Sequence, residues 1–197
     1  MDIQQYINTY LAETAEIAKN IDRETIEKTI KTLLEVKSQK GRIFFLGVGG
    51  GAGTGSHAAN DFNKIAKISS ICLSDNPALL TALVNDEGWE SIFKRQLEMH
   101  QLTANDCLFI FSVGGGTETT SKNLVEAINY AKEIGAKIIG VVGKDTGVTA
   151  QEANACIITP CPEPSRRTAH TEDFQMIMDH LLSNLLAEIE NENIRQA

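Results

Sequence analysis

The chain has 197 residues, of which 42% are hydrophobic and 22% are charged, a composition typical of one globular domain with a full core. The formal net charge of −8 argues against a nucleic-acid partner, which would need a broad basic surface. No apolar run approaches the roughly 20 residues of a membrane span, and the first residues lack a signal-peptide pattern. We therefore expect a cytoplasmic protein with no membrane partner.

Two amphipathic helices are predicted over residues 3–19 and 23–38, because apolar side chains recur at helical spacing in both. Asp22 lies in the break between them and is a suitable N-cap for the second helix. Apolar stripes on more than one side of these helices indicate subunit contacts. The whole chain is predicted to be a single domain, with residues 1–40 as a helical extension of a core over 41–197.

Short apolar runs alternate with helical segments in the rest of the chain. The runs expected to form strands are 43–46, 71–73, 107–111, 137–142 and 155–158. The segments expected to be helical are roughly 55–66, 77–98, 121–134, 146–153 and 168–191. Such alternation is typical of a parallel sheet that is covered on both faces. The predicted fold is α/β: a three-layer αβα sandwich with a five-stranded parallel sheet, two N-terminal helices and a long C-terminal helix.

A glycine-rich segment, residues 47–56, follows the first predicted strand and contains six glycines in ten positions. Strand, glycine loop and helix N-terminus together offer backbone N–H groups to an anion, so we place Gly49, Gly50 and Ser56 in a substrate site. The alternative is a tight turn that only packs the strand against the helix. The segment matches neither the dinucleotide fingerprint nor a P-loop, which disfavours a nucleotide-binding Rossmann domain.

A second glycine-rich segment, residues 112–121, follows the third predicted strand and enters a helix with five hydroxyl side chains. Hydroxyls and backbone N–H groups at a helix start are typical of a phosphate site. A simple N-cap is the alternative, although one cap explains only one hydroxyl. The residues assigned to this site are Ser112, Gly114, Thr117, Thr119, Thr120 and Ser121. Like the first segment, it lies at the carboxyl ends of the strands, where open α/β sheets bind ligands.

Two His/carboxylate pairs are predicted on helices. His57 and Asp61 are four residues apart and share one helix face, and Glu172 and His180 are eight residues apart on the last helix. If the two helices meet above the sheet, two imidazoles and two carboxylates converge, a set that suits Zn²⁺ or a similar divalent ion, or acid–base chemistry. The alternative is a surface pair and a structural histidine.

The remaining candidates are the cysteines and one basic cluster. None of the four cysteines belongs to a CxxC pair, which argues against a zinc site built from cysteine. Cys72, Cys107 and Cys156 lie in apolar runs and are expected to be buried free thiols. Arg166 and His170 belong to a tight basic cluster that either contacts an anion or is solvated.

Taken together, these motifs resemble the SIS (sugar isomerase) domain family, and within it the phosphoheptose isomerase branch. The motifs are Gly47-x-Gly-Gly50, His57-x-x-x-Asp61, Ser74-Asp-Asn76, residues 80–86, Ser112-x-Gly-Gly115, Gly143-Lys-Asp145, His170-Thr-Glu-x-x-Gln175 and His180. The resemblance implies a flavodoxin-like fold, a phosphosugar substrate and a homotetramer with sites between subunits. It also places Asp75, Asn76 and Lys144 in the substrate site.

The implied activity is that of an aldose–ketose isomerase, converting sedoheptulose 7-phosphate to a heptose 7-phosphate through an enediol. By this resemblance Asp61 is the base and His180 moves protons, with His57, Asp61, Glu172 and His180 as ligands of zinc. The two roles of Asp61 compete, because a bound metal lowers its basicity. At the position of Asp61 the branch typically has Glu, and at the position of Glu172 it typically has Gln. The alternative is a non-catalytic SIS module that binds a phosphosugar or a protein such as a replication initiator. The altered glycine segments favour this alternative, whereas the four retained polar groups disfavour it.

Overall fold

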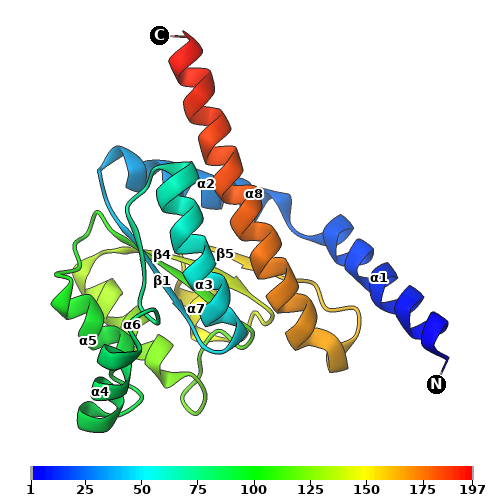
Figure 1. Ribbon diagram of the computed structural model, residues 1–197, viewed down its shortest axis with the longest axis horizontal. Coiled ribbons are helices and arrows are strands. Elements are labelled where there is room, and N and C mark those ends of the chain that lie inside the picture. Colours follow the sequence, from blue (N-terminus) through cyan, green and yellow to red (C-terminus); the bar gives the residue numbers. More distant parts are fainter. Residues whose placement is uncertain (1, 197) are drawn as a thin grey trace.

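A computed structural model describes residues 2–196 and contains an all-parallel five-stranded sheet of order β2-β1-β3-β4-β5 (Figure 1). The strands are β1 (Ile43–Gly47), β2 (Ser70–Cys72), β3 (Cys107–Ser112), β4 (Lys137–Val142) and β5 (Ala155–Ile158). Most strand residues are buried and none is exposed, which explains why the strands are continuous apolar runs and not alternating ones. The fold class and the five predicted strands are confirmed.

Helices flank the sheet on both faces. They are α1 (Ile3–Asn20), α2 (Arg23–Ser38), α3 (Gly50–Asp61), α4 (Pro77–Glu87), α5 (Ile92–Met99), α6 (Lys122–Ile134), α7 (Val148–Glu152) and α8 (Arg167–Gln196). A π-helical turn, Phe62–Ala66, extends α3, and a short 3₁₀ turn, Pro164–Arg166, leads into α8. No helix among residues 2–196 is both long enough and apolar enough to cross a membrane.

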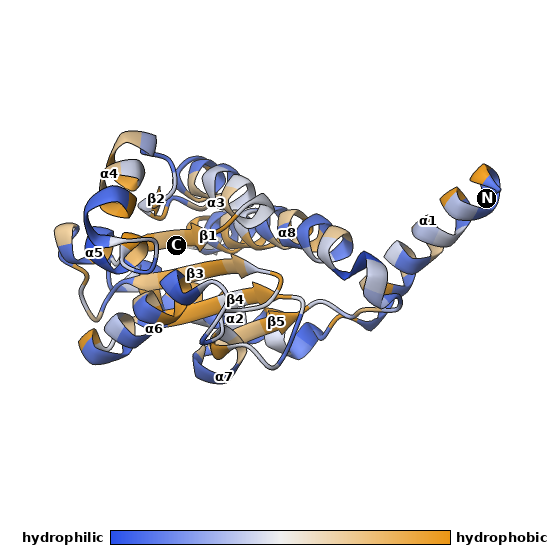
Figure 2. Ribbon diagram, turned by 90° about the horizontal axis from the view of Figure 1, so that it is seen from below, coloured by the Kyte–Doolittle hydropathy of each residue, from blue (hydrophilic) through white to orange (hydrophobic). Residues whose placement is uncertain are grey.

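The core consists of two layers of side chains, one on each face of the sheet. The strands between these layers are coloured as hydrophobic in Figure 2. On one face Phe45 and Phe109 pack against residues of α2, α3 and α8. On the other face Phe44 and Leu108 pack against residues of α4, α5 and α6. Because successive strand residues point to opposite faces, β1, β3 and β4 each supply both layers. The three-layer sandwich is therefore confirmed, and α3 and α8 lie on the same face.

The glycine-rich segment after β1 is mostly helical, which corrects the predicted loop over 47–56. Helix α3 begins at Gly50, about five residues before the predicted start at residue 55. The physical reason is close packing: a Cβ on Gly51 would overlap the backbone oxygen of Phe111, and a Cβ on Gly47 would overlap the backbone of Gly51. These glycines therefore let the helix start directly against the sheet, despite their low helix propensity.

The predicted helix over 77–98 is two helices, because Gly88 between them adopts a φ of 88° that ends α4. Cys72 and Cys107 are buried free thiols as predicted, whereas Cys156 is only half-buried. Burial still raises the pKa of Cys156 to about 12.

Candidate functional site

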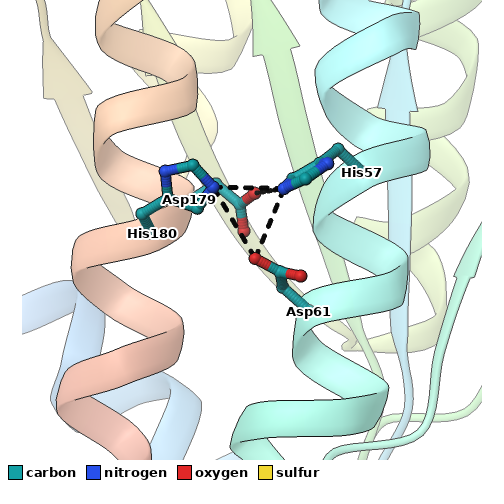
Figure 3. A group of neighbouring side chains, drawn as sticks. All are labelled: His57, Asp61, Asp179 and His180. Carbon is teal, nitrogen blue, oxygen red and sulfur yellow. Dashed lines mark hydrogen bonds and ion pairs between the residues drawn. The ribbon is translucent and has the colours of Figure 1, made fainter.

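Helices α3 and α8 pack side by side on one face of the sheet, and four polar side chains converge between them (Figure 3). Helix α3 contributes His57 and Asp61, and α8 contributes Asp179 and His180. One ligand atom from each lies within 4.8 Å of the other three. His57 and Asp61 are four residues apart on α3, and Asp179 and His180 are adjacent on α8. All four groups therefore lie at the interface between the two helices.

The two imidazoles are the closest pair, with His57 Nε2 3.1 Å from His180 Nε2. Asp61 Oδ2 lies 3.4 Å from His57 Nε2 and 3.7 Å from His180 Nε2. Asp179 Oδ2 lies 3.9 Å from His57 Nε2. Two ring nitrogens at hydrogen-bond distance either share a proton or direct both lone pairs at a cation. Imidazole and carboxylate groups in this arrangement could hold a divalent metal ion.

The two carboxylates have different surroundings. Asp61 is 7% exposed and its Oδ1 accepts a hydrogen bond of 2.9 Å from the side-chain amide of Asn60. Asp179 is 0% exposed, and neither of its oxygens has a hydrogen-bond partner. Burial, together with the negative charge of Asp61, raises the pKa of Asp179 to about 7. A buried carboxylate without a partner is costly, so this site is electrostatically suited to a cation.

The structure brings together three of the four predicted ligands, His57, Asp61 and His180. The fourth, Glu172, lies outside this group: its carboxylate lies against Gly50, in the first turn of α3. The fourth member of the cluster is Asp179 and not Glu172. The sequence analysis did not predict a role for Asp179.

A signal for Asp179 does exist in the sequence. Gln175, Asp179 and Ser183 recur every four residues along α8, and all three are fully buried. Gln175 donates to the backbone oxygen of Val141, and Ser183 donates to that of His180. Asp179 is the member of this polar stripe whose side chain makes no hydrogen bond within the described residues. A stripe of polar residues beside an apolar helix face is therefore the pattern to look for.

The hydroxyl-rich segment after β3 forms a compact loop. Ser112 Oγ accepts a hydrogen bond from the amide of Gly115, and Thr117 Oγ1 accepts from the amides of Thr119 and Thr120. Ser121 is at the N-cap position of α6 with a φ of 52° and makes no capping hydrogen bond. The simple N-cap interpretation is thus not what the structure shows. The side chains of Thr117, Thr119 and Thr120 are exposed, and Gly114 is half-buried.

The other predicted substrate residues lie on neighbouring loops or on the start of α3. Gly49, Gly50 and Ser56 are exposed at or near the N-terminal half of that helix. Asp75 and Asn76 follow β2, where Asn76 caps α4 through a hydrogen bond from the amide of Leu79.

Lys144 is exposed after β4. It lines a cavity of about 360 Å³ with residues that include Thr159 and Arg167. All of these residues lie toward the carboxyl ends of the strands.

The basic cluster before α8 is engaged within the chain. Arg166 Nε donates to Glu13 Oε2 at 2.7 Å, and His170 Nε2 lies 3.0 Å from the same oxygen. Arg167 donates to the backbone oxygen of Gly143. The two contacts of Glu13 join α1 to the start of α8, so Arg166 and His170 contact a carboxylate of their own chain.

Comparisons with known proteins agree on one family. A family model described as SIS domain matches residues 5–143. The phosphoheptose isomerase of Helicobacter pylori (strain P12) is 28% identical over 184 residues, which cover 90% of this chain and 91% of that protein. That of Aneurinibacillus thermoaerophilus is 26% identical, covering 94% of both chains. A solved phosphoheptose isomerase from Neisseria gonorrhoeae superposes with a TM-score of 0.82 at 24% identity, covering 94% of this chain and 99% of that one.

Proposed function

The chain belongs to the SIS domain family, and we propose that it is an aldose–ketose isomerase that converts sedoheptulose 7-phosphate to a heptose 7-phosphate. The observation that carries this proposal is the convergence of His57, Asp61 and His180 between α3 and α8. Relatives that match about nine-tenths of the chain are named phosphoheptose isomerases, which supports this choice of substrate. Such an enzyme would work in the cytoplasm as a homotetramer.

Isomerisation requires a base that removes the proton from the carbon next to the carbonyl and returns it to the neighbouring carbon. We assign this role to Asp61, whose Oδ1 is fixed by Asn60 and whose Oδ2 faces both imidazoles. His180, whose side chain is 52% exposed, is placed to move protons between the substrate oxygens. Each such group contributes on the order of 10²–10⁴-fold to the rate. The intermediate is an enediol.

A divalent metal, which we propose to be Zn²⁺, fits the donor set of His57, His180 and the nearby carboxylates. When bound, the ion would polarise the substrate oxygens and stabilise the negative charge of the enediolate. The unpartnered, buried carboxylate of Asp179 supports a cation at this position. By the sequence resemblance, Glu172 is expected to be a further ligand. In this structure the Glu172 carboxylate lies against Gly50.

The substrate phosphate is proposed to bind where exposed hydroxyls and backbone amides gather at the carboxyl edge of the sheet. The proposed substrate residues are Ser112, Gly114, Thr117, Thr119, Thr120 and Ser121, with Gly49, Gly50, Ser56, Asp75, Asn76 and Lys144. The start of α3 adds the positive end of a helix dipole to this edge. Lys144, which is exposed in the segment after β4, is proposed to supply a positive charge.

Incubation with sedoheptulose 7-phosphate in D₂O, followed by NMR, tests the proposed activity. We expect deuterium at the carbon next to the carbonyl and an aldose product. D61N and H180Q should each lower the exchange rate by at least about 10²-fold, because each removes a proton-transfer group. Circular dichroism serves as the control for folding. Retained exchange in both variants would exclude these roles, and no exchange in the wild type with or without Zn²⁺ would favour a non-catalytic SIS module.

A further inference from the structure

We infer that Asp179 is the carboxylate that completes a metal site with His57 and His180, and that Asp61 is thereby left free for proton transfer. The metal site itself follows from the geometry between α3 and α8, whereas the role of Asp61 rests on the proposed function. The sequence assigned Asp61 two competing roles, as metal ligand and as base. A second carboxylate in the same cluster allows those roles to be divided.

The first argument is the isolation of Asp179 within the protein. Its side chain is fully buried and both oxygens lack a hydrogen-bond donor. Among residues 2–196, the single ion-pair contact of Asp179 is with His57 Nε2 at 3.9 Å, which is beyond hydrogen-bond distance. No lysine or arginine of the described chain pairs with it. Buried carboxylates are normally paired or bound to a metal, so a cation between Asp179 and the two imidazoles supplies the missing partner.

The second argument is that Asp61, unlike Asp179, has a hydrogen-bond donor within the protein. The amide of Asn60 donates to its Oδ1, and its Oδ2 lies near both imidazoles. Asp61 also keeps some exposure, which a group that must reach the substrate needs. Two histidines and one carboxylate leave coordination positions open for a substrate oxygen, as catalytic metal sites do. A site with four protein ligands on tetrahedral Zn²⁺ would be closed to substrate.

The third argument concerns Glu172, which lies on α8 two turns before His180. Its carboxylate lies close against Gly50, where an added Cβ would overlap it, and it is absent from the group of converging ligand atoms. To reach the imidazoles it would have to leave this position. Asp179, in contrast, already lies within 4.8 Å of the ligand atoms of His57 and His180.

Metal titration of the metal-free protein separates these carboxylates. Zn²⁺ affinity is measured by calorimetry and Co²⁺ coordination by its visible spectrum, for the wild type, D179N, D61N and E172Q. We expect D179N to weaken Zn²⁺ binding by more than about 100-fold, which exceeds the 10–100-fold loss typical of outer-sphere partners. D61N and E172Q should change the affinity by less than about 10-fold, and D61N should keep the Co²⁺ spectrum.

Thermal melts give a second readout that does not depend on activity. Zn²⁺ should raise the melting temperature of the wild type, D61N and E172Q, because it binds only the folded state, and should leave D179N unchanged. Metal-free D179N should melt above the metal-free wild type, since the amide removes a buried unpaired charge. If D179N does not fold, D179S removes the same carboxylate with a smaller side chain.

The inference fails if D179N binds Zn²⁺ as tightly as the wild type, or if D61N or E172Q loses as much affinity as D179N. It also fails if the wild type binds neither ion at micromolar concentration. These outcomes are separate from the test of the proposed function. A wild-type protein that binds Zn²⁺ through Asp179 but catalyses no deuterium exchange would overturn the isomerase and leave the metal site standing.

Discussion

Gly51 marks the tightest contact between α3 and the sheet. A Cβ at this position would overlap the backbone oxygen of Phe111, which is held in β3 by its pairing with Gly47 of β1. At the neighbouring Gly50, a Cβ would meet only the carboxylate end of Glu172, a flexible side chain. Neither glycine has a positive φ, so the two positions differ in what surrounds them and not in backbone strain.

Alanine at these two glycines should therefore have unequal effects. We expect G51A to lower the free energy of unfolding by about 2 kcal/mol or more, since a rigid backbone cannot yield to the added methyl group. G50A should change it by less than about 1 kcal/mol, because the better helix propensity of alanine offsets the displacement of Glu172. Urea unfolding followed by circular dichroism measures both values. Equal destabilisation of the two variants would contradict this account of the glycines.

Between elements, a polar cluster joins α1 to the beginning of α8. Glu13 on α1 accepts hydrogen bonds from Arg166 and faces His170, and the hydroxyl of Tyr10 donates to Asp173 at 2.9 Å. The Tyr10 and His170 rings are 4.4 Å apart between centroids. The Arg166 guanidinium, followed by His170, lowers the pKa of Glu13 from 4.5 to about 2. This cluster orients α1, whose first turns project from the body of the molecule (Figure 1).

The sign of this pKa shift predicts how stability depends on pH. Because the pKa of Glu13 is lower in the folded state, its contribution to stability is complete above about pH 5 and is lost as the pH falls toward 2. We expect E13Q to melt below the wild type at pH 7, with the difference shrinking between pH 5 and pH 2.5. Y10F keeps the carboxylate and should show the wild-type dependence. A difference that is constant with pH would rule out this role for Glu13.

Elements and site residues differed in how far the sequence could predict them. β4 and β5 were predicted at their observed bounds, because buried parallel strands are continuous apolar runs. The helical start at Gly50 was not, since its glycines favour helix only through contacts with the sheet. His57 and Asp61 were paired from their spacing of four residues. Asp179 was missed, because the four-residue polar repeat that contains it does not show by itself which side of α8 is buried. That depends on how the helix packs against α3.

At the scale of the whole molecule, two surfaces remain apolar. On α1 the exposed side chains are Ile3, Tyr6, Ile7 and Leu11. On α8 three of the exposed apolar side chains, Ile177, Leu181 and Leu185, recur every four residues and form a stripe next to His180. Helix α1 extends away from the sheet, and the C-terminal end of α8 extends in another direction (Figure 1). Contiguous apolar surface on projecting helices is typical of subunit contacts.

We expect the purified protein to sediment at micromolar concentration as the homotetramer that the sequence resemblance implies, with the α8 stripe in a subunit contact. L181E should lower the sedimenting mass, because it buries a charge in that contact. I194E is the matched control: Ile194 is an exposed apolar residue of the same helix on a different side from the stripe, and its replacement should leave the mass unchanged. Because the stripe adjoins His180, L181E should also reduce deuterium exchange. A monomeric wild type, or equal dissociation in both variants, would contradict this assignment of the contact.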